Sequence, residues 1–281
     1  MPDPLRLDRA LIRISGTDTF PFLNNLLTQN IDRLRTEPVV YSGLLTPQGK
    51  VLADMFVWAD SDDAGDSVLI ECAHGASADL VRRLIMYRLR ANVRVDDITG
   101  TLDVLFSLAA FDGASPDPRL PALGWRAVSP DPPEPARFAD GEALYARHRI
   151  GLGAPDLARD AAPEEVFAGE ALFEELNGVD FQKGCFVGQE NVSRMKRRAT
   201  TRKKFCRIGF DGPAPAPSTP IRAGEAELGS VRSGVEGAAI ALLRLDRALE
   251  AAEKGENLLA EGQEMRLDPP EWLILPQRGE G

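Results

Sequence analysis

Cysteine and histidine are scarce in this sequence, and their scarcity excludes whole classes of site. The three cysteines, Cys72, Cys185 and Cys206, are widely spaced and form no C-x-x-C pair, which argues against a disulfide framework and against a four-cysteine metal site. His74 and His148 are the only histidines in 281 residues, so a conventional zinc site is not expected. By counting alone, Cys185 and Cys206 with a distant histidine remain an alternative, but we expect no metal.

Long apolar runs and nucleotide-binding motifs are also missing. No segment approaches the roughly 18 uncharged apolar residues of a spanning helix, and MPDPLRLDRALIRISG at the N-terminus does not read as a signal peptide. We therefore expect no membrane contact and a cytoplasmic location. Neither GxGxxG nor GxxxxGK[ST] occurs, which leaves a Rossmann or P-loop nucleotide site without support.

Positive charge is in deficit overall but concentrated in one segment. The chain has a net charge of −10, yet residues 183–204 contain eight cations against one anion, so the other 259 residues carry −17. Such segregation predicts a local anion site in an otherwise acidic protein.

The hydrophobic pattern predicts short strands with helices sparsely inserted between them. Helical spacing follows Thr17, a hairpin turn is expected at Pro47–Gly49, and a second helix is expected from Ser77. This order favours an α+β fold with largely antiparallel sheets. Strand-like runs occupy residues 10–14, both sides of the Pro47–Gly49 turn, and the segments SVLIECA, NVRVDDI and LDVLFSLA.

Two proline-rich stretches indicate how the rest of the chain is divided. Residues 112–136 contain seven prolines and are expected to form a long, mostly irregular surface connection. The second stretch, 211–220, precedes strand-like segments around glycine turns. We predict one region over residues 1–200, built from two interleaved α+β modules, and a small C-terminal β domain over 201–281.

The stretch FQKGCFVGQENVSR, residues 181–194, carries the strongest candidate chemistry. Gly184 and Gly188 on either side of Cys185 predict a tight loop that exposes the thiol or approaches a ligand closely. Lys183 and Arg194 would favour the thiolate and increase its reactivity.

Less specific interpretations of these residues stay open. A free cysteine is more often a small buried hydrophobe. Glu190 could complement the dipole of a short helix, and with Arg194 at i, i+4 it could form an ordinary surface pair.

The segment KGCFVGQE resembles the KGC[FY]xGQE signature of the YgfZ family, folate-binding proteins related to the glycine-cleavage T-protein and to a mitochondrial iron–sulfur assembly factor. The likeness extends over nearly the whole chain, through RISGTDTFPFLNNLLTQNI, GLLTPQGKVLADMFVW, MYRLRANVRVDD, HRIGLGAPDL and LGSVRSG. One departure is RRATTRKK, where the family usually has a glycine after the signature.

The resemblance implies a ring of three modules, two of α+β, ferredoxin-like type and a small C-terminal β-barrel, with tetrahydrofolate bound near the centre. A folate needs a carboxylate for its pterin, apolar walls for its aminobenzoyl ring and cations for its glutamate tail. Asp54 is the carboxylate we would choose, although a solvent-facing strand aspartate is an equal alternative. The other expected contacts are Met55, Phe56 and Trp58 as walls, and Gly184, Gly188, Gln189, Arg197 and Arg198 in the loop and basic stretch.

Three functions are compatible with these residues. The first is a folate-dependent accessory factor in assembly or repair of iron–sulfur clusters, with Cys185, Lys183, Glu190 and Arg194 as its reactive group and the cluster belonging to client or assembly proteins. No stably bound cluster is expected, because one generally needs about four thiolates. The second is a one-carbon transferase, disfavoured because Ala53 replaces one of the paired aspartates of the T-protein and Gly151 replaces its glutamate. An RNA-binding module using residues 194–204 ranks last, because no aromatic pattern interleaves the cations.

Overall fold

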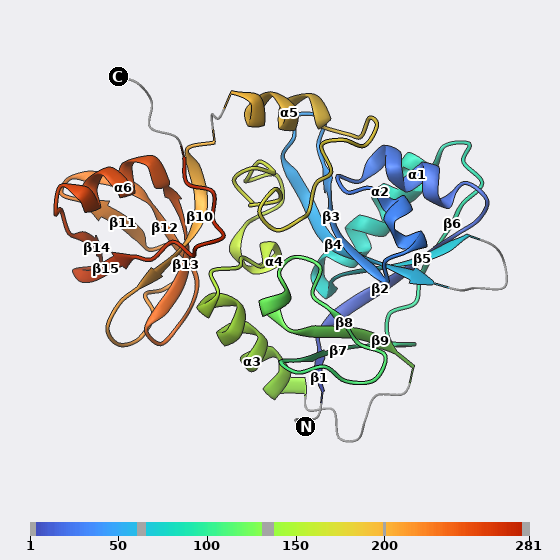
Figure 1. Cartoon of the computed structure of the whole chain (residues 1–281), viewed down its shortest axis with the longest axis horizontal. Coiled ribbons are helices and arrows are strands. Elements are labelled where there is room, and N and C mark those ends of the chain that lie inside the picture. The colour runs from blue at the N-terminus through green and yellow to red at the C-terminus, as the bar shows by residue number, and fades with distance from the viewer. Residues whose placement is uncertain (1–3, 61–65, 131–137, 199–200, 277–281) are drawn as a thin grey trace.

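Three β-structures make up the chain in this computed structural model, which describes residues 4–60, 66–130, 138–198 and 201–276. Figure 1 shows the C-terminal barrel at one end and the two sheets at the other, with helices between and above them. The first sheet has five antiparallel strands in the order β3-β4-β5-β2-β6. Its strands are β2 (Arg9–Ser15), β3 (Val39–Leu45), β4 (Val51–Asp60), β5 (Ser67–Ala73) and β6 (Arg94–Asp97).

Both faces of the five-stranded sheet are buried, and the strand period of two decides which residues face which side. Val40, Met55 and Val57 pack with helices α1 (Thr19–Leu26) and α2 (Ser77–Arg88). The alternate residues Tyr41 and Phe56 pack against the segment 166–179 on the other face. The predicted hairpin around Pro47–Gly49 is confirmed as β3 and β4, with Gly49 at φ 83°.

The second sheet corrects the prediction for residues 112–136. It has four strands in the order β1-β7-β9-β8, and two of them, β8 (Ser115–Pro116) and β9 (Trp125–Ser129), belong to the proline-rich stretch that was expected to be irregular. The other two are β1 (Leu5–Leu7) and β7 (Asp103–Ser107), and a short 3-10 helix, η3 (Pro121–Leu123), precedes β9. Residues 131–136 of the stretch lie outside the described part.

Buried ion pairs explain why this proline-rich stretch folds inward. Arg126 on β9 is 1% exposed and contacts Glu71 of the first sheet. Arg119 donates to Asp117 Oδ2 over 2.7 Å, and both side chains are buried. Buried charges need partners of this kind, so the Arg126–Glu71 pair holds the segment to the first sheet, while its backbone pairs within the second sheet.

The C-terminal part is a closed six-stranded barrel, as the resemblance implied, in the order β10-β13-β12-β11-β14-β15 with β15 pairing back to β10. Three helices, α3, α4 and α5, connect it to the sheets. The barrel strands are β10 (Lys203–Gly209), β11 (Pro220–Ala223), β12 (Ala226–Val235), β13 (Ala238–Arg244), β14 (Leu258–Ala260) and β15 (Gln263–Leu267). The remaining helices are η1 (Ile31–Arg35), η2 (His74–Ala76), α3 (Phe138–Gly151), α4 (Leu157–Asp160), α5 (Gln189–Arg197) and α6 (Leu245–Glu253).

Arg149 on α3 links the barrel to helices α3 and α4. Its guanidinium is fully buried and donates to Asp160 Oδ2 over 2.9 Å and to Ser233 Oγ over 2.7 Å. Since Arg149, Asp160 and Ser233 come from α3, α4 and β12, this cluster fixes β12 to two elements, α3 and α4, that contribute to the lining of the cavity described next. The division of the chain near residue 200 stays a prediction.

Candidate functional site

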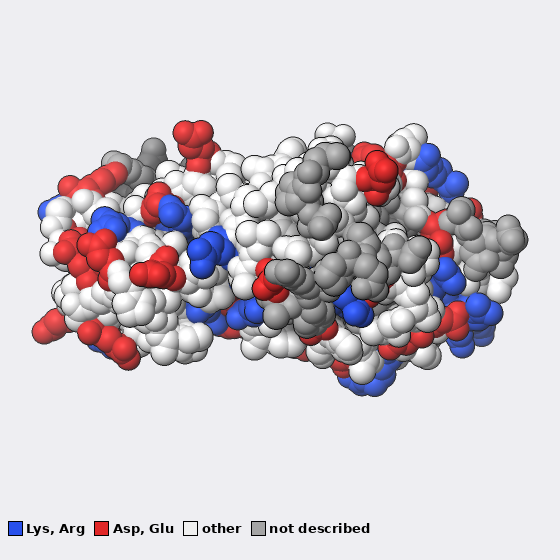
Figure 2. Space-filling model, turned by 90° about the horizontal axis from the view of Figure 1, so that it is seen from below, with Lys and Arg blue, Asp and Glu red and all other residues white. Residues whose placement is uncertain are grey.

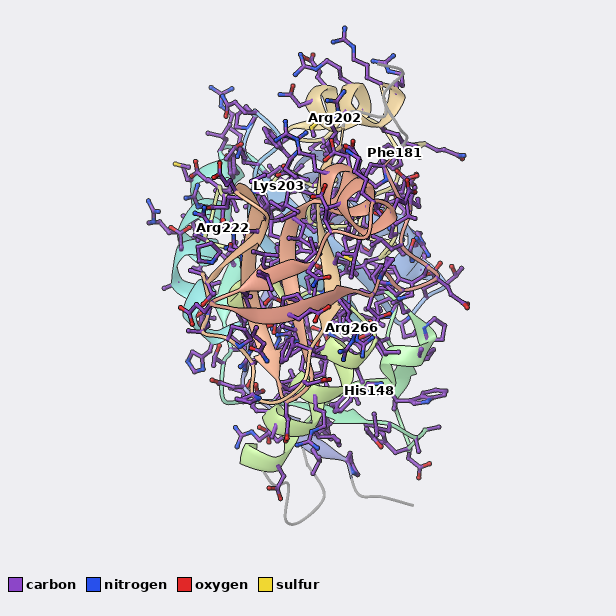
Figure 3. The ribbon with its side chains drawn as sticks, turned by 90° about the vertical axis from the view of Figure 1, so that its left-hand side faces the viewer. His148, Phe181, Arg202, Lys203, Arg222 and Arg266 are labelled. Carbon is purple, nitrogen blue, oxygen red and sulfur yellow. The ribbon has the colours of Figure 1, made fainter. Side chains whose placement is uncertain are left out.

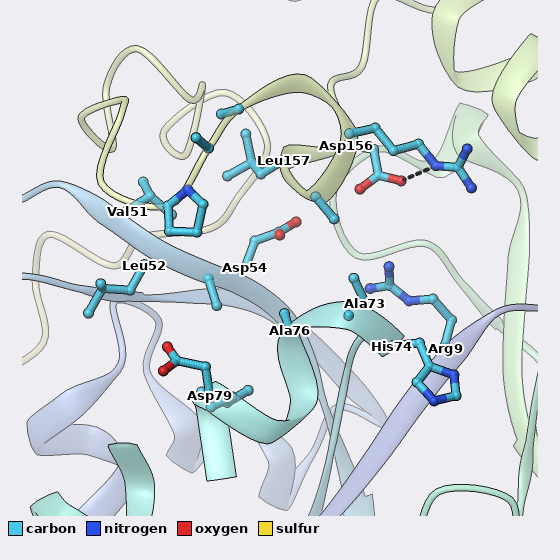
Figure 4. A pocket seen from close by; sticks show the side chains of 18 of the residues that line it. Arg9, Val51, Leu52, Asp54, Ala73, His74, Ala76, Asp79, Asp156 and Leu157 are labelled. Atoms are coloured by element: carbon cyan, nitrogen blue, oxygen red, sulfur yellow. Dashed lines mark ion pairs between the residues drawn. The ribbon is translucent and has the colours of Figure 1, made fainter. Parts of the chain in front are cut away.

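A cavity of about 550 Å³ opens between the first sheet, the helix pair η2–α2 and the segment around α4. Strand β4 contributes Val51, Leu52 and Asp54, and Leu157 with Val166 comes from the opposite side. Figure 4 shows the carboxyls of Asp54 and Asp156 pointing into the space between these walls. The cavity therefore has an apolar wall with a small number of convergent polar groups, the usual composition of a small-molecule site.

Asp54 is the central polar group of the cavity. Its carboxyl is partly buried and accepts a hydrogen bond from the Tyr41 hydroxyl, with 2.9 Å between the oxygens. Burial raises the pKa of Asp54 above its ordinary value, and the neighbouring negative charge of Asp156 raises it further, against the attraction of Arg9 and Arg119. The protonated form of Asp54 is thus favoured more than in an exposed aspartate.

Asp156 behaves in the opposite way, although it is only 7% exposed. Burial opposes its ionisation, but the guanidinium groups of Arg149, Arg9 and Arg159 outweigh this and lower its pKa. Arg159 Nε lies 3.5 Å from Asp156 Oδ2, the contact dashed in Figure 4. Two carboxyls in one cavity whose pKa values are driven apart are a common basis for acid–base chemistry.

Arg9 supplies a fixed positive charge beside both carboxyls. Its Nε donates to Glu71 Oε1 over 2.9 Å, and Glu71 Oε2 accepts from Trp58 Nε1 over 3.0 Å. Burial lowers the pKa of Arg9, but Glu71, Asp156 and Asp54 raise it to a net value above that of an exposed arginine. Arg9 therefore stays charged.

The rim of the cavity is charged, and its groups pair with one another. His74 Nδ1 lies 3.1 Å from Asp8 Oδ1, and the Asp8 amide donates to Glu142 Oε1 over 2.8 Å. Glu142 also pairs with Arg159. The charged side chains of the rim are thus already paired in the free protein. The charged end of a ligand would have to compete with these pairs or extend past them.

The predicted apolar contacts do not line this cavity. Met55 is fully buried on the opposite face of the sheet, against α1 and α2. Phe56 is 1% exposed and lies under Arg126 and Arg119, with guanidinium-to-ring distances of 4.1 and 4.8 Å. The apolar wall is formed instead by residues that the sequence did not single out, namely Leu44, Val51, Leu52, Leu157 and Val166.

The loop that contains Cys185 lies elsewhere, at the start of α5 and against the β3–β4 turn. Cys185 is exposed, as predicted, whereas Cys72 and Cys206 are buried. Gly188 has φ 85°, and a Cβ there would lie 2.7 Å from the Thr46 carbonyl oxygen, so glycine is required where the loop meets the hairpin. At Gly184 a Cβ would meet nothing within 4 Å, so no close approach constrains that position.

Lys183 makes backbone contacts that its position in the sequence did not indicate. Its Nζ donates to the Leu27 carbonyl over 2.8 Å and to the Gln29 carbonyl over 2.7 Å. Leu27 is the C-cap of α1, so the ammonium satisfies carbonyls at a helix end. Burial lowers its pKa to about 8, against the opposing charges of Asp180 and Asp32. Lys183 thus anchors the loop beneath Cys185.

The other predicted loop residues lie on or beside α5. Gln189 Nε2 donates to the Gly184 carbonyl over 3.4 Å, and Arg194 donates to Asn191 Oδ1. Glu190, Arg197 and Arg198 are exposed. None of residues 183–198 lines the cavity at Asp54, so the structure separates the predicted folate contacts into two places.

The buried thiols differ from Cys185 in chemistry as well as position. Burial raises the pKa of Cys72 and of Cys206 to about 12. Cys206 is 1% exposed inside the barrel. Among the described residues, no group of three or more potential metal ligands is present and no helix is long and apolar enough to span a membrane.

The sequence pattern did not reveal Asp156, Arg9 or the rim residues. Asp156 follows a proline and is the N-cap of α4, a signal that could have located the helix start. Nothing local indicated that this cap faces Asp54, because the two aspartates are separated by 102 positions.

Comparison with known proteins first defines the class. A crystal structure of glycine cleavage system aminomethyltransferase T from Bartonella henselae aligns with a TM-score of 0.70 at 13% identity, over 98% of this chain and 87% of that one. The family described as "CAF17, C-terminal beta-barrel domain" matches residues 202–274. The chain therefore has an aminomethyltransferase-T fold with a CAF17-type barrel.

Sequence relatives narrow this class. The iron-sulfur cluster assembly factor IBA57 homolog, mitochondrial, of Neurospora crassa is 31% identical over 240 residues, 74% of this chain and 54% of that protein. Human iron-sulfur cluster assembly factor IBA57, mitochondrial, is 28% identical over 273 residues, 85% of this chain and 76% of that protein. The chain thus spans about half the length of the first of these. Its sequence is thus similar to those of the IBA57-type iron–sulfur cluster assembly factors.

One expectation is overturned by these relatives. A cytoplasmic location was expected because the sequence does not read as having a targeting segment. The relatives from Neurospora, human and mouse are all named as mitochondrial factors, which contradicts that expectation.

Proposed function

We propose that this protein binds a reduced folate in the cavity beside Asp54 and assists assembly or repair of iron–sulfur clusters in client enzymes. The observation that supports folate binding most directly is Asp54, a partly buried carboxyl with a raised pKa in a cavity of about 550 Å³. A cavity of this size suits a ligand as large as a folate. The support for the cluster role is the relationship to IBA57-type factors.

Each part of a folate has a chemical counterpart in the cavity. Asp54 would pair with the donor edge of the pterin, and Leu44, Val51 and Leu157 would pack against its rings. The folate's glutamate would extend toward the rim. The iron–sulfur cluster would be the cargo of partner proteins, with Cys185 as this chain's exposed reactive thiol.

Isothermal titration calorimetry with 5-formyltetrahydrofolate tests the binding step. We expect micromolar affinity, on the order of 8 kcal/mol, and a loss of about tenfold or more in Asp54→Asn because a charge-assisted pair is removed. Asp60→Asn, on the same strand but outside the cavity lining, is the matched control. Equal affinities in the wild type and Asp54→Asn would remove Asp54 from the site.

Complementation in cells that lack the protein tests the cluster role. Cys185→Ser should fail to restore the activity of a cluster-containing enzyme, whereas Cys206→Ala, which changes a buried thiol of similar size, should restore it. Full restoration by Cys185→Ser would exclude the thiol from the function while leaving folate binding to the calorimetric test.

One observation favours a second candidate, one-carbon transfer from a folate to an unknown acceptor. The loss of the T-protein's second aspartate at Ala53 argued against it, but Asp156 brings another carboxyl into the cavity, with a pKa shifted opposite to that of Asp54. Consumption of methylenetetrahydrofolate with a defined acceptor, lost in both Asp54→Asn and Asp156→Asn, would support this candidate over a pure accessory role.

A further inference from the structure

The basic segment 183–204 divides into cations that the fold uses and cations that it leaves exposed. Lys183 binds two carbonyls, and Lys204, which is 7% exposed, donates to Glu175 Oε1 over 2.5 Å. Lys196 lies 2.9 Å from Glu174 and 3.7 Å from the centre of the Phe181 ring. These lysines are explained by the fold.

Three arginines on α5 are not explained in this way. Arg194, Arg197 and Arg198 are exposed and, with Glu190 at i−4 from the first, lie on one face of the helix. Together with Asn191 they line a shallow surface hollow of about 520 Å³. Within the described residues, the side chains of Arg197 and Arg198 make no hydrogen bond or ion pair. We call these five residues the arginine face.

The arginine face is unfavourable for the isolated helix. Arg194 is three residues from Arg197 and four from Arg198, spacings at which like charges repel by a few tenths of a kcal/mol. The helix dipole offsets part of this for cations near the C-terminus. Figure 3 shows α5 at the top of the molecule with its nitrogen-tipped side chains pointing away from the body, so neither the core nor the barrel neutralises them.

We propose that the arginine face is a docking site for an acidic polypeptide segment of a partner protein. Guanidinium groups match carboxylates in a bidentate geometry, and three of them along two helical turns suit a segment of about four to six residues. Glu190 places one negative charge at the N-terminal end of the face and would repel an acidic residue there. The segment is therefore acidic toward the C-terminus of α5 and neutral or basic toward Glu190.

The charge distribution favours a short acidic segment over a nucleic acid. The basic segment is the exception in a chain with a net charge of −10, so a longer polyanion would be repelled by the net negative charge of the rest of the chain. Figure 2, which views the molecule from the side opposite α5, shows acidic and basic side chains interspersed. The aromatic rings next to the face are not free for stacking, because Phe186 is 7% exposed and Lys196 covers Phe181.

The proposal is tested by fluorescence anisotropy on the full chain. The probe is a fluorescein-labelled peptide with six consecutive glutamates, and a glutamine peptide of the same length is the reference. The test variant is Arg194→Gln/Arg197→Gln/Arg198→Gln. The control, Arg82→Gln/Arg222→Gln/Arg266→Gln, removes the same charge from exposed arginines elsewhere, with 69%, 51% and 59% of their side chains exposed.

We expect the α5 variant to lose about tenfold in affinity for the glutamate peptide, the control to change by less than about twofold, and Glu190→Gln to bind more tightly. Equal losses in the α5 variant and the control, or no loss in the α5 variant, would overturn the proposal. If the melting curve shows that the α5 variant does not fold, two other measurements decide the outcome. These are the affinity of Glu190→Gln for the glutamate peptide, which should increase, and the affinities of the single variants Arg197→Gln and Arg198→Gln, which should decrease.

Two further probes separate other occupants. A 12-nucleotide oligouridine that binds tighter than the peptide and depends on the same arginines would make the face a nucleic-acid site and overturn the proposal. A pteroylpentaglutamate whose affinity depends on the arginine face, with no peptide binding, would assign the face to the folate tail. The docking proposal does not rest on folate binding, because the glutamate peptide contains no pterin and 5-formyltetrahydrofolate affinity is measured separately.

Discussion

Replacing Asp54 with asparagine should make the free protein more stable while weakening its ligand binding. Asparagine has nearly the same shape and can still accept the hydrogen bond from Tyr41, which spans 2.9 Å in the wild type. What it removes is a carboxyl whose ionised form is disfavoured by burial and by Asp156. Groups kept for function at the expense of stability behave in this way.

The sign and pH range of the effect follow from the raised pKa. Below the ordinary aspartate pKa of 3.8, Asp54 is protonated in both the folded and the unfolded chain, so the variant and the wild type should differ little. As pH rises through that value, the unfolded chain releases its proton first, and the wild type loses stability until Asp54 also ionises in the folded state. The advantage of Asp54→Asn therefore grows with pH and reaches its plateau once Asp54 has ionised in the folded chain.

The expected advantage at pH 7 is on the order of 1 kcal/mol, the usual gain from such a substitution, or about 2 to 4 °C in melting temperature for a chain of this size. Asp60→Asn on the same strand is the matched control and should be destabilising. Asp60 Oδ2 accepts hydrogen bonds from Arg13 Nε over 2.8 Å and from Ser67 Oγ over 2.9 Å.

Urea denaturation of the wild type and both variants between pH 4 and pH 8, followed by circular dichroism, measures these differences. A loss of stability in Asp54→Asn at pH 7, or an advantage that is the same at pH 4 and pH 8, would show that the Asp54 carboxylate is well stabilised in the free protein. The inference that the free protein disfavours the ionised form of Asp54 would then be wrong.

Three further predictions follow from the structure. Lys183→Met should lower the free energy of unfolding by about 1 to 2 kcal/mol, because two carbonyls lose their donor. It should also change the alkylation rate of Cys185. Urea denaturation measures the first effect and iodoacetamide kinetics the second, and a stability equal to that of the wild type would contradict the anchoring role. In the native protein Cys185 should be alkylated at least about a hundred times faster than Cys72 and Cys206, as identified by mass spectrometry; comparable rates would mean that the buried thiols open readily. Arg126→Met should destabilise by about 3 kcal/mol, because it leaves a buried carboxylate without one of its partners, and an unchanged melting temperature would show that the remaining partners compensate.

Features with a local cause could be predicted from the sequence. The β3–β4 hairpin follows from apolar runs on either side of Pro47–Gly49, and the loop at Gly188 from glycines around a cysteine. The first helix was predicted too, from the helical spacing after Thr17, and its N-cap is Asp18. The closed barrel came from the family resemblance, with local support only from strand-like runs between glycine turns.

Features that depend on distant partners could not be predicted. Residues 112–136 appeared irregular because of their prolines, yet Arg126 is buried against Glu71, 55 positions earlier. The anchoring contacts of Lys183 were not predicted, because its carbonyl partners at Leu27 and Gln29 are more than 150 positions away. Met55 was placed in the cavity by its proximity to Asp54, whereas the pleat of a strand points neighbouring side chains to opposite faces.

The single exposed thiol has a practical consequence for handling and observing the protein. Because Cys185 is exposed while Cys72 and Cys206 are buried, a maleimide dye would label one defined position without any cysteine having to be replaced. That position lies on the loop where Gly188 touches the β3–β4 turn, and β4 carries Asp54. A fluorophore at Cys185 would thus lie on a loop that contacts the hairpin carrying Asp54, where it could report ligand entry. For the same reason, we expect oxidation in air during purification to join two copies through a Cys185 disulfide, which a reductant would prevent.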